Sequence, residues 1–254
     1  MKNIIIFITA LIFTSWGCEK DPIIDPVFEA KTSPKDTLAI NTSSNCQFND
    51  NVLSPQFNPD LTYGMVKDID GNVYKTIQIG TQVWMAENLR TTRYNDGSPI
   101  YLGTGDMAGE TDWFDLRSGA YCWYFNDSVN KTMGAIYNWF AIEPGKLAPE
   151  GWHVPSNSDW GTLINYLGGE SLAHNKLLSK GTNESGFTAI PSPIVCGWGF
   201  GPEISFWSSA SYSNPHAFVP YAYYFCIWEE NSNPKVSLFN DPQSYGFCVR
   251  CVKN

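Results

Sequence analysis

The sequence predicts an α+β fold in which short antiparallel strands are combined with one or two helices. Three observations indicate this fold: a hairpin pattern at residues 65–79, a helical pattern at residues 156–169, and a run of short β-rich segments after residue 186. Strands that follow one another in runs, and do not alternate with helices, favour an antiparallel sheet. No internal repeat is visible that would indicate a repeat architecture.

The hairpin is predicted where the turn sequence DIDGN, residues 68–72, separates two segments rich in β-branched and aromatic residues. Asp-Gly between such segments is a strong hairpin signal, because glycine readily adopts the positive φ of a tight turn. The same letters begin like a calcium-binding EF-hand loop. Ile79 stands where that loop needs a bidentate glutamate, and no helices flank the turn, so we interpret it as a turn without metal.

The clearest helix is predicted directly after Pro155. Ser156 can cap its N-terminus, and Asp159 can complete a capping box. Apolar side chains then recur at helical spacing, at Trp160, Leu163, Ile164 and Leu167. Two glycines at residues 168–169 end this helix. A second, shorter helix with a thin apolar face is predicted at residues 171–179.

The last third of the chain is predicted to form short strands separated by turn residues. The β-rich segments are residues 187–190, 206–209, 222–228, 236–239 and 245–252. In residues 221–228 both sets of alternating side chains are apolar. Because successive side chains of a strand point to opposite faces, that strand is predicted to be central in its sheet.

Composition and charge set limits on the partners of the protein. Hydrophobic residues make up 43% and aromatic residues 15% of the 254 residues, which is typical of a chain with a packed core. The formal net charge is -9 and no cluster of Lys and Arg is present. Nucleic acid is therefore excluded as a partner, because phosphate binding depends on such a cluster. Attachment to an anionic membrane would need a covalent anchor.

The N-terminus predicts export and lipid attachment. Lys2 precedes an apolar run at residues 4–13, which is shorter than the roughly twenty residues needed to span a bilayer. Gly17 then precedes Cys18, an arrangement that resembles the lipobox of bacterial lipoproteins, although Ser15 and Trp16 depart from the usual pattern. We therefore expect a signal peptide at residues 1–17 and lipidation of Cys18. An ordinary signal peptide with a chance cysteine is the alternative.

The residues after Cys18 are predicted to form a flexible linker. Charged residues at positions 19–21 resemble the short tag of lipoproteins that reach the cell surface. Prolines and small polar residues dominate from there to about residue 61, and a coil of about forty residues spans roughly 35 Å. The predicted organisation is a signal peptide at 1–17, a lipidated cysteine and linker at 18–62, and one folded domain at 63–254. We expect an outer-membrane lipoprotein exposed at the cell surface.

Several segments match the pattern of one protein family in its order. They are VKDIDGNVYKTIQIGTQVWMAENL at residues 66–89, GAYCWY at 119–124, GAIYNW at 134–139, PEGWHVP at 149–155, NESGFTAIP at 183–191, FWSS at 206–209 and VRCV at 249–252. Over residues 64–253 the chain resembles the Fibrobacter succinogenes major paralogous domain, FISUMP. The resemblance implies a secreted or lipid-anchored protein for which the family has no established activity.

A second and more distant resemblance concerns the fold. GWHVPSNSDW at residues 151–160 is similar to a segment of the formylglycine-generating, sulfatase-modifying family. That family implies a C-type-lectin-like domain, but it does not imply sugar binding. The chain departs from FISUMP at Ala148, where many members have cysteine, and it adds Cys196, Cys226 and Cys248.

The cysteines are expected to form disulfides. Seven cysteines less Cys18 leave six, an even number in an oxidising compartment. Cys122 with Cys251 is the first candidate pair and Cys196 with Cys226 the second, while other pairings stay open. Cys248 and Cys251 have the spacing of a redox or zinc motif. Residues three apart in a regular strand point to opposite faces, so we expect neither a mutual bridge nor a metal site.

The histidines give little support to an enzyme. His153 is interpreted as a residue whose ring nitrogens hold a turn, and His174 and His216 are expected to be solvated. No nucleophile elbow, zinc-protease motif or phosphate loop is present. An extracellular enzyme acting on polysaccharide or protein thiols stays open as the alternative, because a sequence cannot show whether two carboxylates face each other across a cleft.

The aromatic residues favour a binding module, and with no catalytic or metal motif present we expect no enzymatic activity, cofactor or metal. Exposed aromatic rings offer a flat apolar face to sugars or peptide side chains. Trp113, Trp123, Tyr124 and Trp198 are the candidate ligand-binding residues, while Trp84, Trp139, Trp152, Trp160 and Trp207 are expected in the core. The predicted partners are the membrane, through Cys18, and a glycan or a surface protein.

Overall fold

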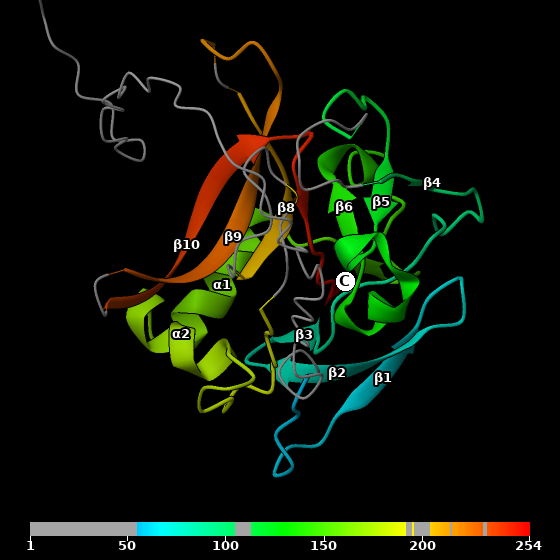
Figure 1. Cartoon of the computed structure of the whole chain (residues 1–254). Helices are drawn as coiled ribbons and strands as arrows, with labels where there is room; N and C mark the ends of the chain where they lie inside the picture. Colours follow the sequence, from blue (N-terminus) through cyan, green and yellow to red (C-terminus); the bar gives the residue numbers. More distant parts are fainter. Residues whose placement is uncertain (1–54, 105–112, 192–194, 196–203, 214, 231–232) are drawn as a thin grey trace, which may run out of the picture. The chain divides into compact units, whose positions relative to one another are not determined.

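The computed structural model describes residues 55–104, 113–191, 195, 204–213, 215–230 and 233–254 (Figure 1). The chain divides into Met1–Cys46 and Gln47–Asn254, and all described residues belong to the second unit. The predicted signal peptide, Cys18, Cys196 and Trp198 lie outside the described residues, as does most of the predicted linker. Among the helices that are described, none is long and apolar enough to cross a bilayer.

The predicted hairpin is confirmed and belongs to a five-stranded antiparallel sheet of order β1-β2-β3-β12-β7. Its strands are β1 Gly64–Lys67, β2 Val73–Ile79, β3 Gln82–Met85, β7 Trp152–His153 and β12 Val252–Lys253. Asp68 closes the first turn by accepting hydrogen bonds from the Asn72 backbone N–H at 2.9 Å and from the Tyr74 hydroxyl. The end of the chain thus lies beside the start of the domain, because Val252 pairs with Trp84 of β3.

A second sheet has four strands in the order β11-β6-β5-β4. They are β4 Tyr101–Leu102, β5 Ala120–Cys122, β6 Ile136–Asn138 and β11 Gly246–Phe247. Short 3-10 helices adjoin this sheet: η2 Tyr124–Asn126, η3 Ser128–Met133 and η4 Trp139–Ala141. The β4–β5 pair is parallel, which differs from the wholly antiparallel arrangement that the sequence predicts.

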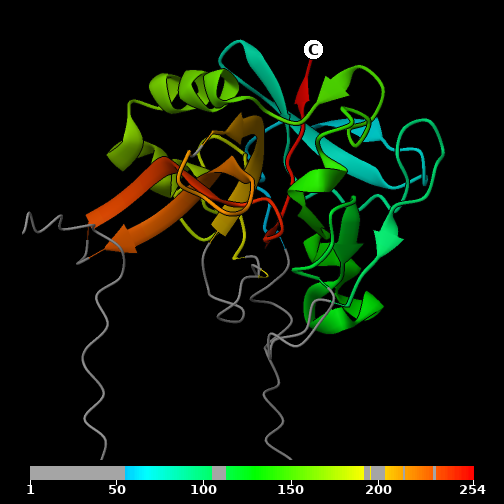
Figure 2. The same ribbon diagram turned by 90° about the horizontal axis from the view of Figure 1, so that it is seen from above.

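The third sheet is a long antiparallel ribbon of order β10-β9-β8, coloured from gold at β8 to orange-red at β10 in Figures 1 and 2. It contains β8 Ile204–Tyr212, β9 Tyr221–Glu230 and β10 Asn233–Pro242. The prediction that residues 221–228 form a central strand is confirmed, since β9 pairs with both neighbours. A register shift interrupts the β8–β9 pairing between Trp207 and Ser211.

Two helices pack against one face of the three-stranded sheet (Figures 1 and 2). They are α1 Asn157–Tyr166 and α2 Glu170–Leu177, close to the predicted bounds. The predicted capping box of α1 is present: Ser156 accepts from the Asp159 N–H, and the Asp159 side chain accepts from Ser156. Trp160 of α1 stacks on Phe225 of β9 with ring centroids 4.3 Å apart. The fold is therefore α+β.

Two predicted strands differ in the structure. Residues 187–190 form no strand, because Thr188 has a positive φ of 59° and only Leu178 and Ala189 form a bridge. Residues 245–252 do not form one strand either. They cross all three sheets: β11 joins the second sheet, Cys248 bridges Phe206 of β8, and β12 joins the first sheet. The last segment of the domain therefore holds the sheets together.

The core consists of two large clusters of buried side chains. One lies under α1 and α2 and is built around Trp84, Trp160, Phe187, Phe206 and Phe225. The other lies around the four-stranded sheet and contains Tyr137, Trp139, Trp207 and Phe247. Four of the five tryptophans expected in the core are buried, and Trp152 is partly buried. His174, expected to be solvated, is buried in α2 with 7% of its surface exposed.

Candidate binding surfaces

Trp113 is not available to a ligand. Its side chain is 1% exposed and packs in a small cluster with Ala120, Cys122 and Ile136. A Cβ atom at Gly103 would lie 2.8 Å from the Trp113 ring, which shows how closely backbone covers it. The expectation that Trp113 binds a ligand is therefore wrong. The sequence could not show this, because the residues that cover the ring come from β5, β6 and other distant segments. Trp198 lies outside the described residues.

Trp123 and Tyr124, in contrast, lie at the surface beside a third aromatic residue. Both side chains are partly exposed, and Phe125 is 42% exposed. The rings of Tyr124 and Phe125 are stacked with centroids 4.0 Å apart, while Trp123 packs edge-on against Tyr121 at 5.3 Å. We call Trp123, Tyr124, Phe125 and the 73% exposed Val129 the aromatic surface.

The backbone beneath the aromatic surface has an uncommon conformation. Phe125 has φ 53° and ψ 24°, and Asn126 has φ 56°, so two consecutive residues other than glycine are left-handed. Such residues cost about 1–3 kcal/mol each and persist only where the surroundings hold them, often at functional sites. Here the Asn130 side-chain amide donates to the Tyr124 carbonyl at 3.0 Å, and Asp127 caps η3 by accepting from the Val129 N–H at 2.9 Å. The result is a stacked pair of rings presented outward.

Further exposed apolar and polar groups are linked to the aromatic surface through neighbouring residues. Tyr101 and Leu102 on the edge strand β4 are 56% and 53% exposed, and Leu102 pairs with Tyr121, the residue against which Trp123 packs. Asn126 at the end of η2, Asp127 between the two helices and Ser128 at the start of η3 are exposed. A flat aromatic pair beside side chains that donate and accept hydrogen bonds can bind the C–H face and the hydroxyls of a sugar.

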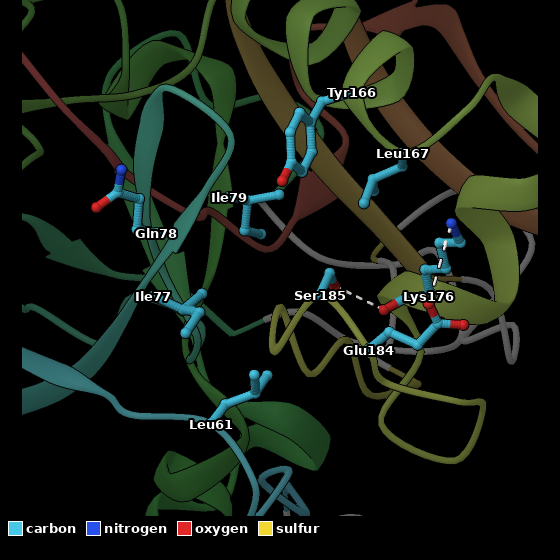
Figure 3. A pocket seen from close by; sticks show the side chains of 9 residues that line it. All are labelled: Leu61, Ile77, Gln78, Ile79, Tyr166, Leu167, Lys176, Glu184 and Ser185. Carbon is cyan, nitrogen blue, oxygen red and sulfur yellow. Dashed lines mark hydrogen bonds and ion pairs between the residues drawn. The ribbon is translucent and has the colours of Figure 1, made fainter.

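A cleft of about 410 Å³ lies between the β2–β3 hairpin and the two helices (Figure 3). Its floor is aliphatic, with Leu61, Ile77, Ile79 and Leu167, and its rim carries Tyr166, Lys176, Glu184 and Ser185. Figure 3 shows Gln78 pointing away from these side chains. Sequence reasoning missed this cleft, because its residues come from five separate segments and no motif unites them.

Residues 55–62, expected in the linker, are packed against the domain and contribute Leu61 to this cleft. Phe57 and Tyr63 lie edge to face at 5.4 Å, and the Lys75 ammonium lies 4.0 Å from the Phe57 ring centroid. Asn183 donates from its side-chain amide to the Gln56 carbonyl at 3.1 Å. The segment before β1 is thus held by specific contacts.

His153 connects helix α1 to the last residue of the chain. Its Nδ1 lies 2.7 Å from Oδ1 of Asn254, and its Nε2 lies 3.2 Å from Oδ2 of Asp159. Burial alone would raise the pKa of Asp159, but hydrogen bonds from Ser156 and the contact with His153 outweigh it and hold the pKa below its usual range. The Ser156 hydroxyl donates to Asp159 and not to His153. The imidazole therefore does not activate this serine as a nucleophile.

The predicted disulfides are not found among the described cysteines. Cys122 and Cys251 are not bonded to each other, and Cys251 is a fully buried thiol. The predicted Cys122–Cys251 disulfide is therefore wrong. The two cysteines belong to different clusters of buried side chains: Cys122 lies in the cluster around Trp113, and Cys251 lies in the cluster around Tyr137. Burial, with a smaller effect of Asp68, raises the pKa of Cys251, which disfavours the reactive thiolate. The second pair includes Cys196, outside the described residues.

The acidic turn at residues 68–72 uses its carboxylates within the fold. Asp70 accepts from the Thr92 N–H and from the Arg93 guanidinium at 2.6 Å, and Asp68 accepts from Asn72 and Tyr74. Burial alone would raise the pKa of Asp70, but these hydrogen bonds from Thr92 and Arg93, with one from Thr91, hold it below its usual range. In the described part of the chain no three His, Cys, Asp or Glu side chains are grouped so that they could hold a metal ion.

The fold and the surfaces define an α+β domain with exposed aromatic rings and a separate amphipathic cleft. Residues 77–253 match the Fibrobacter succinogenes major domain, and the chain belongs to this family. The match begins within β2 and includes β3, both helices and the closing strand β12. The comparison with curated proteins gave no match, and the comparison with solved structures gave none either.

Proposed function

We propose that this protein is a lipid-anchored module on the outside of the outer membrane that binds glycan through the aromatic surface and has no enzymatic activity. The observation that carries the proposal is the stacked Tyr124–Phe125 pair, in which the Phe125 ring is exposed and its backbone is left-handed. Backbone strain that a fold maintains at a surface points to a function of that surface. A protein ligand, the other predicted partner, would also find apolar surface there, but the neighbouring Asn, Asp and Ser side chains favour a sugar.

The fold proposed for this module is C-type-lectin-like. The distant resemblance of residues 151–160 supports it, together with the pairing of β12 with β3 that brings the two ends of the domain together. Two helices against one sheet and small separate sheets are compatible with it. Such a fold says nothing about the ligand by itself.

Three arrangements weigh against the rival proposal of an extracellular enzyme. Glu184 is the one carboxylate that lines the cleft, whereas glycoside hydrolysis uses a pair of them. The Ser156 hydroxyl donates its hydrogen bond to Asp159 and not to the imidazole of His153. The Cys251 thiol is buried, so it is not accessible to protein thiols.

Anchoring is tested by labelling cells with a fatty-acid analogue and fractionating them. The wild-type chain is expected in the outer membrane with label, and Cys18→Ser is expected to be unlabelled and released. Protease added to intact cells should degrade the wild-type chain if it faces outward. Retention of label in Cys18→Ser would refute the anchor.

Binding is tested with the Cys18→Ser full chain, incubated with a panel of plant and bacterial polysaccharides. Phe125→Ala is expected to reduce binding about tenfold, which corresponds to ~1.4 kcal/mol. Phe218→Ala is the matched control, because Phe218 is fully exposed outside the aromatic surface. Equal binding by both variants, or no binding of any polysaccharide by the parent chain, would contradict the proposal.

A further inference from the structure

We propose that the cleft between the β2–β3 hairpin and helices α1 and α2 is a second binding site, and that it takes an extended peptide segment with one large apolar side chain. The cleft shares no residue with the aromatic surface. The inference therefore does not rest on glycan binding at that surface.

The floor of the cleft suits an apolar side chain. Ile77, Ile79 and Leu167 are almost fully buried at its base, and its volume of about 410 Å³ lies within the range of pockets that hold small ligands. An aliphatic floor gains most from another apolar group, because it offers no partner for a hydroxyl. Sugars are recognised better by flat aromatic faces, and Tyr166 is the single aromatic residue that lines the cleft.

The rim supplies one cation and one anion at a spacing that fits a peptide backbone. The Lys176 ammonium and the Glu184 carboxylate lie 4.0 Å apart, with side chains 29% and 58% exposed, so their mutual attraction is weak. In an extended chain the N–H and C=O of one residue point to the same side. The C=O of such a residue can accept from Lys176 while its N–H donates to Glu184. The side chains of neighbouring residues then point toward or away from the floor.

The rim is held in place before any ligand arrives. The Ser185 hydroxyl donates to the Lys176 carbonyl of helix α2 at 2.6 Å. This hydrogen bond attaches the loop that contains Glu184 to the helix. Asn183 and Thr188 both have positive φ and are joined by a buried hydrogen bond from the Thr188 N–H to the Asn183 Oδ1 at 3.1 Å. Gly186 completes the loop: a Cβ there would lie 2.9 Å from Leu61 and 3.0 Å from Ile77. Such preorganisation lowers the cost of binding.

Tyr166 closes one end of the cleft. Its ring covers Gly80 so closely that a Cβ atom at position 80 would lie 2.7 Å from it, yet the Tyr166 side chain is still 64% exposed. Figure 3 shows the ring above Ile79. The Tyr166 ring can therefore cover a ligand side chain that lies on the floor of the cleft.

The proposal is tested by nuclear magnetic resonance with the isotope-labelled Cys18→Ser full chain. The probes are blocked peptides acetyl-Ala-Ala-X-Ala-Ala-amide, with Leu, Phe or Asp as X. The Leu and Phe peptides are expected to shift the amide signals of Leu61, Ile77 and Leu167, and the Asp peptide to bind at least about tenfold more weakly because it buries no apolar surface. Equal binding of all three peptides, or no shift at these residues, would overturn the proposal.

Matched variants test the contribution of the rim charges to binding separately from that of the apolar floor. Glu184→Gln and Lys176→Met are each expected to weaken the Leu peptide about fivefold, because a charged partner of its backbone is lost. Glu170→Gln removes an exposed charge of α2 outside the cleft and should leave binding unchanged. Unchanged binding in both rim variants would overturn the backbone contacts. If soluble oligosaccharides shifted the amide signals of the cleft residues and the peptides did not, the peptide proposal would be overturned and the ligand of the cleft would be a glycan.

Discussion

Arg250 donates from its Nε atom to Oδ1 of Asn88 across 2.7 Å, and the Arg250 side chain has no exposed surface. Asn88 donates in turn to the carbonyl of Met133, the last residue of η3, at 2.8 Å. The guanidinium also donates to the carbonyls of Met85, Phe187 and Thr188. The buried arginine therefore joins β3, the loop that continues from the cleft rim, and the segment that follows the aromatic surface.

Replacing Arg250 should be among the most destabilising changes in the domain. Burial lowers the pKa of Arg250 to about 9, so the side chain is still charged at neutral pH and its hydrogen bonds are charge-assisted. Arg250→Met leaves three carbonyls and Asn88 without this donor. We expect a loss of about 3–5 kcal/mol in the free energy of unfolding, measured with urea. Lys131→Met, at an exposed residue of η3, should change it by less than about 0.5 kcal/mol.

A lysine at position 250 should not restore stability. The charge would remain, but the planar fork that reaches Asn88 and the carbonyls simultaneously would be lost. If Arg250→Lys unfolded at the same urea concentration as the wild-type chain, the charge and not the geometry would be the important property.

Stability should decrease in acid, and Asp70 should contribute to the decrease. Its pKa is lower in the folded chain than its ordinary value, so the unfolded chain binds more protons in this range. The contribution is complete above about pH 5 and is lost as the pH falls below about 4 toward the folded pKa. Asp70→Asn should cost about 1–2 kcal/mol at pH 7 and have a smaller effect at about pH 3. A difference that is constant over this range would show that the carboxylate charge is unimportant.

The local features of this fold could be predicted from the sequence. Asp70 and Gly71 determine the first hairpin, and Ser156 with Asp159 determines the start of α1, because these signals act within a few residues. In residues 221–228 the side chains of both faces are apolar, and this is sufficient to predict a central strand. Both faces of β9 do pack against other residues. Each of these predictions needed no knowledge of distant contacts.

The candidate sites could be predicted only in part. Trp123 and Tyr124 were expected to be exposed aromatic residues, but nothing distinguished them from the buried Trp113, whose cover comes from distant strands. The left-handed conformation of Phe125 has no sequence signal, because phenylalanine rarely adopts it. Leu61 and Glu184 line one cleft although 123 residues separate them in the chain, so their proximity depends on the complete tertiary fold.

The N-cap of α1 should contribute modestly and measurably to stability. Ser156→Ala removes the hydroxyl that accepts from the Asp159 N–H at 3.2 Å and should cost about 1 kcal/mol. Ser156→Asp, which can also cap, should recover most of this loss. Ser158→Ala, an exposed serine of the first turn of the helix, provides the control. A cost above ~3 kcal/mol would indicate a further role of Ser156.

The Cys251 thiol should resist modification in the folded protein. It is fully buried and its pKa is raised, so access and thiolate formation are both disfavoured. Iodoacetamide followed by peptide mass spectrometry should find Cys251 unmodified without denaturant and modified in urea. Rapid modification of the native protein would support the thiol-directed enzyme instead.

Replacing Phe125 by glycine should weaken ligand binding and leave the free energy of unfolding nearly unchanged. Glycine adopts the left-handed region without the cost of about 1–2 kcal/mol that a residue with a Cβ incurs. Removal of the ring eliminates the contact with Tyr124, worth about 0.5–1.5 kcal/mol, so the two changes approximately cancel. Phe125→Gly is therefore expected to unfold within about 1 kcal/mol of the wild-type chain while binding polysaccharide about tenfold more weakly, as Phe125→Ala does. If its binding were preserved at unchanged stability, the strained aromatic pair would have no part in recognising the ligand.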